Sequence, residues 1–381
     1  MVRLSLSDAN VEPFRIEYSD DAIADLRDRL RRTRWPEAEP VDDWSQGVPL
    51  AYLQELCAYW AEGYDFGAAQ ARLNAVPHYR TPIDGLGIHF VHVRSPHAGA
   101  LPLVLTHGWP GSVVEFLGVI DALTNPDDPA HAFHVVAPSL PGYGWSDRPA
   151  TAGWDVPRIA RAWDELMGRL GYHRYGAQGG DWGAMVTTSL AQQAPERLVG
   201  IHVNMPVVPL DRAPMDNLTA REQGALTRIR DHAKWGRGYS SQQSTRPQTL
   251  GYGLVDSPVG QCAWIVEKFR EWTDCAGHPE NALTKDQILD NISVYWFTAT
   301  AASSARLYWE SFRNVDNAEV TVPSGVSVFP EELLRVSRRW AQTRFTDLRW
   351  FGEPEKGGHF AAFEQPAAFV DEVRGFFRQV R

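Results

Sequence analysis

The sequence predicts an α/β protein in which a mostly parallel central sheet carries helices on both faces. Short apolar runs alternate with helical segments over residues 81–205, and the same alternation resumes over residues 316–381. Such alternation is typical of parallel strands joined by helical crossovers. The chain has 381 residues, of which 44% are apolar and 22% charged. This composition is that of a folded globular protein with a large core.

Residues 1–80 are charged and helical in character, and we expect an N-terminal arm there. The stretch 21–34 places Ile23, Leu26 and Leu30 at helical spacing, and Trp35-Pro36 ends it. A second amphipathic helix is expected over 50–60. Two short helices cannot form a core alone, so the arm must pack on the larger domain.

The remaining chain divides into two halves of the core and one insertion. In the first half, over 81–205, we expect strands at 88–93, 101–105, 134–137, 174–178 and 199–203, with helices near 112–122, 156–170 and 184–193. The second half, over 316–381, has expected strands at 326–329 and 348–351, with helices from about residue 332 and near 363–379. Residues 206–315 are helical, aromatic and poor in strand signals, which indicates an inserted helical lid.

Charge and cysteine content exclude several classes of protein. The net charge of −10 argues against a nucleic-acid partner and against an anionic membrane surface. No run of 18 apolar residues and no signal peptide is present, so we expect a cytoplasmic protein. The three cysteines form no metal-ligand cluster, and we expect them to be reduced, buried thiols. They are Cys57, Cys262 and Cys275. The sequence leaves the oligomeric state open, including a homo-oligomer.

The segment after the strand at 174–178 carries the candidate nucleophile. Gly180-Asp181-Trp182-Gly183 has small residues around an acidic one, as in a sharp strand-to-helix elbow, with Asp where Ser usually stands. A carboxylate there can attack an sp³ carbon and form an ester that water later cleaves. The structural alternative is that Asp181 only caps the helix that follows.

A histidine near the C-terminus is the candidate base. His359 follows two glycines on a loop after the last expected strand, where it can reach the elbow. A catalytic histidine needs an orienting acid. Glu331 and Glu332 follow the strand at 326–329, and Asp347 is a third option. The chain order nucleophile, acid, base is that of known hydrolases with such an elbow.

The loop after the strand at 101–105 is a candidate oxyanion site. Its donors would be the backbone N–H groups of Trp109 and of Trp182, the residue after the nucleophile. We expect His107 to brace this loop and not to act in catalysis. The bond between Trp109 and Pro110 is a candidate cis peptide.

Four tyrosines of the inserted block could donate a proton to a leaving oxygen. They are Tyr239, Tyr252, Tyr295 and Tyr308. For any one of them, packing alone is the simpler expectation.

Together these motifs resemble those of epoxide hydrolases of the α/β-hydrolase superfamily, in the microsomal-type branch. The resemblance covers nearly the whole chain. The matching segments are Pro13-Phe14, Asp25 to Leu30, Thr33 to Pro36, His107 to Ser112, Pro141 to Ser146, Gly180 to Gly183, Asp256 to Gly260, Glu267 to Phe269, Phe329 to Leu334 and Gly357 to Ala362.

The resemblance implies a role for each candidate residue. It selects Glu332 as the acid and Tyr239 and Tyr308 as the two lid tyrosines, which leaves Tyr252 and Tyr295 as packing residues. Asp181 would open an epoxide and form an alkyl ester, and His359 would activate water to release a vicinal diol. The substrates are a small-molecule epoxide, expected to be bulky or aryl-substituted, and water. No metal or organic cofactor is expected.

The resemblance also suggests a biological context. Membrane-bound members carry an N-terminal anchor that this sequence lacks, so a soluble member is expected. Only 4 of the 37 basic residues are Lys, a composition that resembles actinomycete proteins. Such hydrolases act there on enediyne antibiotic precursors, which makes antibiotic biosynthesis the expected pathway.

Two other functions fit part of the pattern. A haloalkane dehalogenase also has an Asp nucleophile followed by Trp, but it needs no pair of acidic phenols. A non-catalytic binding protein on this scaffold usually lacks a triad member, whereas all three are present here. An ordinary serine esterase is disfavoured because Asp181 occupies the elbow.

Overall fold

The computed structural model describes residues 10–312 and 316–381. Its centre is one sheet, whose strand order within the described residues is β1-β2-β3-β5-β4-β6-β7-β8-β9. Pairing is antiparallel from β1 through β3 to β5 and parallel from β5 onward. The strands are β1 (Glu12–Phe14), β2 (His78–Ile83), β3 (Leu86–Val93), β4 (Leu101–Thr106), β5 (Phe133–Pro138), β6 (Tyr175–Gly179), β7 (Leu198–Val203), β8 (Ser324–Ser327) and β9 (Leu348–Gly352).

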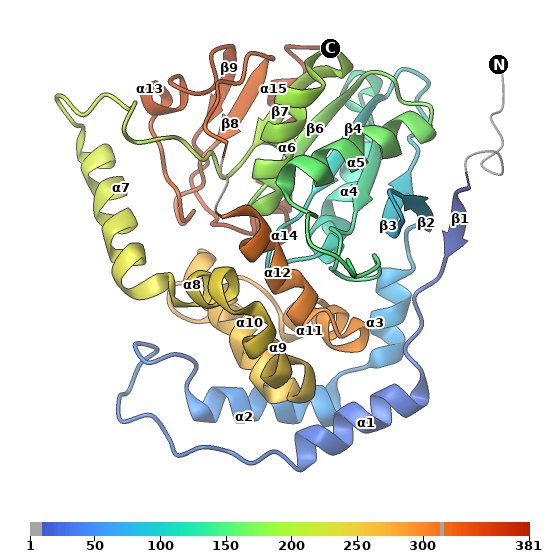
Figure 1. Ribbon diagram of the computed structural model, residues 1–381, viewed down its shortest axis with the longest axis vertical. Helices are drawn as coiled ribbons and strands as arrows, with labels where there is room; N and C mark the ends of the chain where they lie inside the picture. The colour runs from blue at the N-terminus through green and yellow to red at the C-terminus, as the bar shows by residue number, and fades with distance from the viewer. Residues whose placement is uncertain (1–9, 313–315) are drawn as a thin grey trace.

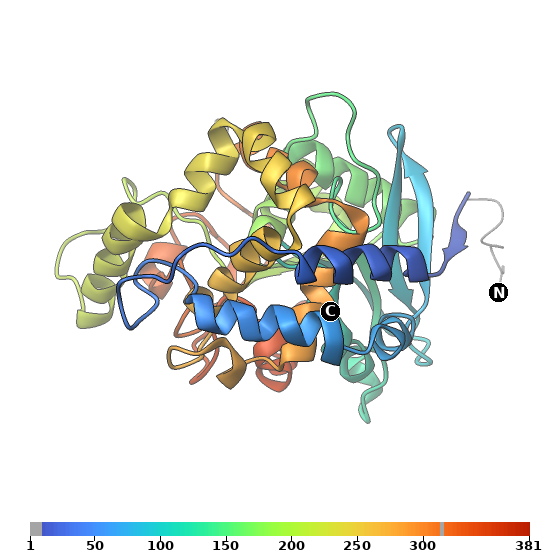
Figure 2. The same ribbon diagram turned by 90° about the horizontal axis from the view of Figure 1, so that it is seen from below.

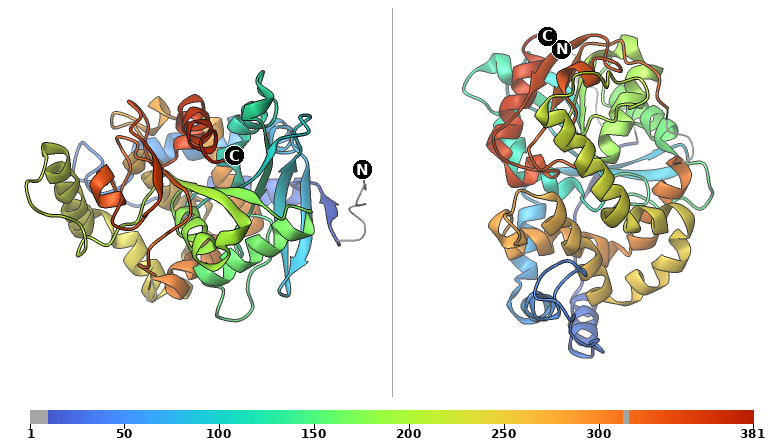
Figure 3. Two further views of the ribbon diagram at one scale, coloured as in Figure 1. Left: turned by 90° about the horizontal axis from the view of Figure 1, so that it is seen from above. Right: turned by 90° about the vertical axis from the view of Figure 1, so that its left-hand side faces the viewer.

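Helices cover both faces of this sheet. Figure 3 shows the sheet nearly edge-on, with α4 (Leu117–Thr124) and α15 (Pro366–Phe377) on one face and α5 (Val156–Arg169) and α6 (Trp182–Gln193) on the other. The strands β4, β5, β6 and β7 are buried along most of their length, because both their faces are covered. The prediction of a mostly parallel sheet with helices on both faces is confirmed.

A group of helices lies between β7 and β8 in the chain and below the sheet in Figure 1. We call α7 to α12 the inserted helices. They are α7 (Ala220–Asp231), α8 (Gly238–Thr245), α9 (Pro247–Asp256), α10 (Pro258–Trp272), α11 (Lys285–Thr298) and α12 (Ala301–Ser311).

The N-terminal segment contributes both to the sheet and to the opposite side of the molecule. β1 pairs with β2 at the edge of the sheet. The helices α1 (Asp20–Arg31), α2 (Leu50–Ala58) and α3 (Phe66–Leu73) follow. Figure 2 shows α1 and α2 side by side across the inserted helices, and both contact α10.

Polar contacts fasten this segment to α11. The Asp290 carboxylate accepts from Arg72 Nη2 at 2.7 Å and from the Tyr64 hydroxyl at 2.5 Å. The Trp60 indole donates to Ser293 Oγ at 3.0 Å. Trp60 and Ser293 are fully buried and Asp290 nearly so, so these bonds lie inside the joint between the two parts.

Two parts of the predicted secondary structure need correction. The strands β1 and β2 were not expected, because β1 has three residues and β2 contains Pro82, and both weaken a strand pattern. The helix expected from about Glu332 does not form. The backbone there is irregular, and within the described residues α13 (Arg338–Ala341) is the only helical segment between β8 and β9. The Glu332 side chain accepts a hydrogen bond from the backbone N–H of Leu333. Such a local bond from side chain to backbone competes with helix formation.

No helix in the described ranges is long and apolar enough to cross a bilayer. All three cysteines are buried and free, as expected. The proposed division at residues 80, 205 and 315 stays a prediction, and residues 313–315 at one of its boundaries lie outside the described ranges.

Candidate active site

Asp181 lies on a tight elbow between β6 and α6. Its backbone has φ 50° and ψ −128°, a conformation that L-residues rarely adopt. Glycine is required on either side of it. A Cβ on Gly183 would come within 1.8 Å of the Thr106 carbonyl oxygen, and one on Gly179 within 2.1 Å of the Gly183 oxygen. The Asp181 side chain makes no capping bond to α6, so the capping alternative is wrong.

The Asp181 carboxylate instead faces two other candidates. Its Oδ1 accepts a hydrogen bond from the backbone N–H of Trp109 at 2.8 Å. Its Oδ2 lies 3.2 Å from Nε2 of His359. The Asp181 side chain is 14% exposed and that of His359 is 2% exposed. The nucleophile candidate is thus held between the predicted oxyanion loop and the predicted base.

The structure brings one of the three candidate acids to His359. Glu332 Oε1 lies 2.7 Å from Nδ1 of the imidazole. Glu331 pairs with Arg228 at 2.6 Å, and Asp347 pairs with Arg349 at 2.8 Å, so both carboxylates are engaged elsewhere. The geometry therefore agrees with the choice of Glu332.

The two carboxylates determine the charge of His359. Burial lowers the pKa of His359, but the negative charges of Glu332 and Asp181 outweigh burial and raise this pKa well above its usual value. A positive imidazolium between two carboxylates is therefore the favoured form while Asp181 is ionised.

The two tyrosines selected by the resemblance converge on Trp109. Tyr239, on α8, stacks on the Trp109 ring with centroids 5.1 Å apart. Tyr308, on α12, meets Trp109 edge-on at 5.9 Å and lies 5.9 Å from Tyr239. Burial raises the pKa of both phenols, so both remain neutral hydrogen-bond donors at physiological pH.

The other two tyrosines lie elsewhere. Tyr252 is 71% exposed. The Tyr295 hydroxyl donates to the Gly111 carbonyl oxygen at 2.7 Å, so Tyr295 supports the oxyanion loop.

Two further residues that the sequence analysis singled out are Trp182 and His107. Trp182 is the first residue of α6, so its N–H has no acceptor within the helix. His107 Nε2 accepts from the backbone N–H of Leu140 at 3.2 Å, and Nδ1 lies 3.0 Å from the Gly108 carbonyl oxygen. His107 therefore braces the loop, as expected. The Trp109-Pro110 peptide is cis.

Sequence reasoning missed two buried ionisable residues near the site. Lys268 is 3% exposed, and its ammonium lies 4.9 Å from the centre of the Tyr239 ring. Its spacing on one face with Ile265 and Trp272 could have indicated burial. Glu115 lines a small cavity beside Asp181. Its Ser-x-x-Glu spacing from Ser112 resembles a helix cap, which hides any other role.

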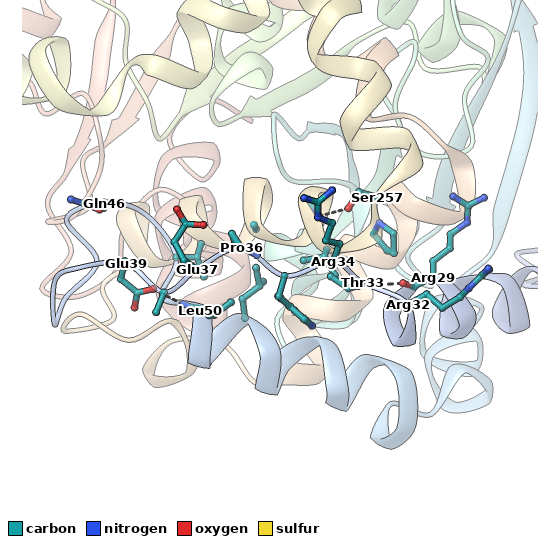
Figure 4. A pocket seen from close by; sticks show the side chains of 18 of the residues that line it. Arg29, Arg32, Thr33, Arg34, Pro36, Glu37, Glu39, Gln46, Leu50 and Ser257 are labelled. Atoms are coloured by element: carbon teal, nitrogen blue, oxygen red, sulfur yellow. Dashed lines mark hydrogen bonds between the residues drawn. The ribbon is translucent and has the colours of Figure 1, made fainter.

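A larger groove lies away from these residues. It has a volume of about 840 Å³ and runs between the segment 29–50 and the start of α10. Figure 4 shows Arg29, Arg32 and Arg34 along it, with Ser257 on the facing side. None of the triad residues lines it. The large groove is therefore separate from the candidate residues, which are brought together by their mutual geometry.

A carboxylate elbow at the end of a central parallel strand, with an acid and a histidine on later loops, defines a hydrolase of the α/β-hydrolase fold. Residues 102–251 match the family described as alpha/beta hydrolase fold, and residues 11–116 match the family described as Epoxide hydrolase N terminus. The chain belongs to the microsomal-type epoxide hydrolases. It is an enzyme that hydrolyses an ether bond, that of an epoxide.

The relatives support this assignment over the full chain. Epoxide hydrolase 1 of Oryctolagus cuniculus is 34% identical, covering 98% of this chain and 90% of that protein. A Stigmatella aurantiaca protein is 56% identical over 97% of this chain and 86% of its own length.

Solved structures agree. The juvenile hormone epoxide hydrolase of the silkworm Bombyx mori has a TM-score of 0.91 and 34% identity, covering 97% of this chain and 95% of that one. The Aspergillus niger epoxide hydrolase has a TM-score of 0.90 and 32% identity, and the match covers 97% of this chain and 96% of that one.

Proposed function

We propose that this enzyme opens its epoxide through a covalent ester on Asp181. The observation that supports this most directly is the position of the Asp181 carboxylate, which contacts the Trp109 N–H through one oxygen and faces His359 through the other. A carboxylate held at a strained elbow is oriented for attack before the substrate arrives.

In the first step, the phenols of Tyr239 and Tyr308 hydrogen-bond the epoxide oxygen. An Asp181 oxygen attacks one ring carbon, the ring C–O bond breaks, and the new alkoxide takes a proton from a phenol. Neutral, buried phenols suit this role, because a donor in a site that excludes water stabilises a developing alkoxide strongly. The inserted helices act as the lid that brings both phenols over Asp181.

In the second step, His359, oriented by Glu332, takes a proton from water. The water oxygen bonds to the Asp181 carboxyl carbon, and the N–H groups of Trp109 and Trp182 hold the oxyanion. Collapse breaks the bond between the Asp181 carboxyl carbon and the alkyl oxygen, which takes a proton from the new carboxyl group, so that the diol leaves and Asp181 is a carboxylate again. Ester formation itself prepares this step, because it removes the negative charge of Asp181 and so lowers the pKa of His359. The imidazolium then gives up its proton, which restores the phenol that protonated the alkoxide, and the neutral imidazole can act as a base.

The substrate we propose is a bulky or aryl-substituted epoxide. Aromatic side chains surround the reacting groups: Trp272 lies 5.0 Å from the Tyr239 ring, and Trp182 lies 4.8 Å from the Tyr308 ring. Such walls favour an aromatic substituent. A place in enediyne antibiotic biosynthesis is a further proposal, which rests on composition alone.

Three compounds test the activity: styrene oxide, a bulkier aryl epoxide and a bromoalkane, with diol and bromide release measured. We expect diol without bromide. Bromide without diol would favour a dehalogenase and contradict the role of the tyrosines.

The covalent step is tested by mass. Asp181→Ala should abolish turnover, and His359→Gln should accumulate a protein heavier by one substrate molecule. In ¹⁸O-labelled water, a single turnover of the wild type should place label in Asp181. Diol formation by Asp181→Ala at the wild-type rate would overturn the proposal.

A further inference from the structure

A small cavity lies beside Asp181. It has a volume of about 20 Å³, and its lining includes Asp181, Asn204, His359 and Glu115. A buried water needs roughly 10–15 Å³ and two to four polar partners. The cavity is thus large enough for one water and polar enough to bind it.

Glu115 lines this cavity and has an unused acceptor. Its side chain is buried, and its Oε1 has no hydrogen-bond partner among the residues that the structure describes. The same carboxyl group hydrogen-bonds the backbone of Ser112. A Cβ on Gly111 would come within 1.5 Å of Oε1, so glycine at that position is what leaves room for the carboxyl. A buried acceptor without a partner costs free energy unless a ligand satisfies it.

Asn204 supplies a donor on another side. Its Oδ1 accepts from Gln178 Nε2 at 2.9 Å, which orients the amide. Its Nδ2 points toward Gly180, where a Cβ would come within 2.7 Å of it. The lining therefore brings together three polar side chains, those of Asn204, Glu115 and His359, around one water-sized space.

We infer that this cavity holds the hydrolytic water and that Glu115 positions that water for His359. The inference rests on the proposed ester mechanism and adds a residue to it. Neither Tyr239 nor Tyr308 lines the cavity, so the epoxide oxygen and the water have separate places. The water is bound before the epoxide enters and is ready when the ester forms.

The steps balance without a further reagent. One O–H bond of the water breaks and its proton passes to His359 Nε2, while the water oxygen bonds to the Asp181 carboxyl carbon. The bond from that carbon to the alkyl oxygen then breaks, and the alkyl oxygen takes the second proton of the water from the new carboxyl group, so that the diol leaves and Asp181 returns to a carboxylate. Glu115 holds the water by a hydrogen bond and exchanges no proton. Burial, aided by the charge of Asp181, raises the pKa of Glu115 to about 8. A carboxyl that stays neutral at pH 7 avoids placing a second negative charge beside the nucleophile.

The alternative is that Glu115 only caps the short helix at Val113–Phe116. Rates of the two chemical steps separate the roles. Trp109 and Trp182 flank Asp181, so stopped-flow tryptophan fluorescence with styrene oxide should report ester formation and ester hydrolysis in turn. The variants are Glu115→Leu, which fills the volume without polar atoms, and Glu115→Gln, which keeps an acceptor oxygen. Glu364→Gln is the matched control, because Glu364 is also buried near His359 but does not line the cavity.

We expect Glu115→Leu to slow ester hydrolysis roughly tenfold or more, the effect of losing one hydrogen bond to the reacting water. Ester formation should stay within about threefold of wild type, and the adduct should accumulate by mass. Glu115→Gln should recover part of the loss, and Glu364→Gln should change neither rate. If Glu115→Leu slows both steps equally or neither, the inference is overturned. If no adduct forms in any variant while diol appears, the ester mechanism itself fails, which is a separate result.

Discussion

Gly108 offers a test of how narrowly the position of Asp181 is fixed. In a Gly108→Ala variant, the new Cβ would lie 2.1 Å from Asp181 Oδ1 and 2.3 Å from Asp181 Cβ. Contacts under 3.0 Å do not persist at a Cβ, so the Asp181 side chain must move by about 1 Å. It cannot swing away freely, because its own Cβ is in the clash and its backbone is held at φ 50°.

A displacement of this size converts into a rate. Misplacing a reacting group by about 1 Å costs on the order of 100-fold. We therefore expect Gly108→Ala to lower the rate of ester formation roughly 100-fold, measured by tryptophan fluorescence with styrene oxide in excess. Gly118→Ala is the control: nothing lies within 4 Å of its Cβ position on α4, so activity should stay at wild type. A Gly108→Ala enzyme within about threefold of wild type would refute the reasoning, since a loss of 100-fold is expected.

Three further variants test other parts of the structure. Glu364 is buried, and burial raises its pKa from 4.5 to about 7. Between these two pH values the unfolded protein releases this proton more readily than the folded protein does. The folded protein therefore loses stability as the pH rises from 4.5 to about 7. In urea unfolding from pH 4.5 to 8, the free energy of unfolding of Glu364→Gln should rise relative to that of wild type by up to roughly 3 kcal/mol. A difference that does not change with pH would contradict this. Asp290→Ala leaves Tyr64 and Arg72 without their shared acceptor and should cost about 2–4 kcal/mol in urea unfolding, whereas Asp286→Ala, which loses one bond to Tyr59, should cost less. Tyr308→Phe should slow ester formation on the order of 100-fold while ester hydrolysis keeps its rate, and equal slowing of both steps would argue against its role.

The parallel part of the fold could be predicted from the sequence because its strands are apolar runs buried on both faces. The strand expected at 101–105 is β4, Leu101–Thr106, and the one at 199–203 is β7, Leu198–Val203. The edge of the sheet could not be predicted in this way. β1 has only three residues, and it is defined by pairing with β2, more than 60 positions away in the chain.

The position of the proposed nucleophile, Asp181, followed from local rules. The glycines around Asp181 are needed by the backbone, and this need is visible in the sequence. Spacing alone left Glu331 and Glu332 open as the acid, and the family resemblance selected Glu332. The physical reason appears only in three dimensions, because the irregular backbone after β8 turns Glu332 toward His359 and Glu331 toward Arg228. A role for Glu115 at the site was not predicted, because the Ser112-x-x-Glu115 spacing is already explained by a helix-capping motif.

The N-terminal segment joins parts of the molecule that belong to opposite sides of the reaction centre. At one end β1 extends the sheet that carries Asp181, and further along Trp60, Tyr64 and Arg72 are bonded to α11. The N-terminal segment therefore connects α11 to the edge of the sheet, and we expect this connection to hinder movement of the inserted helices away from the sheet as a unit. We therefore expect the path to Asp181 to change little in width when substrate binds, so that epoxides are selected by size before any bond is broken.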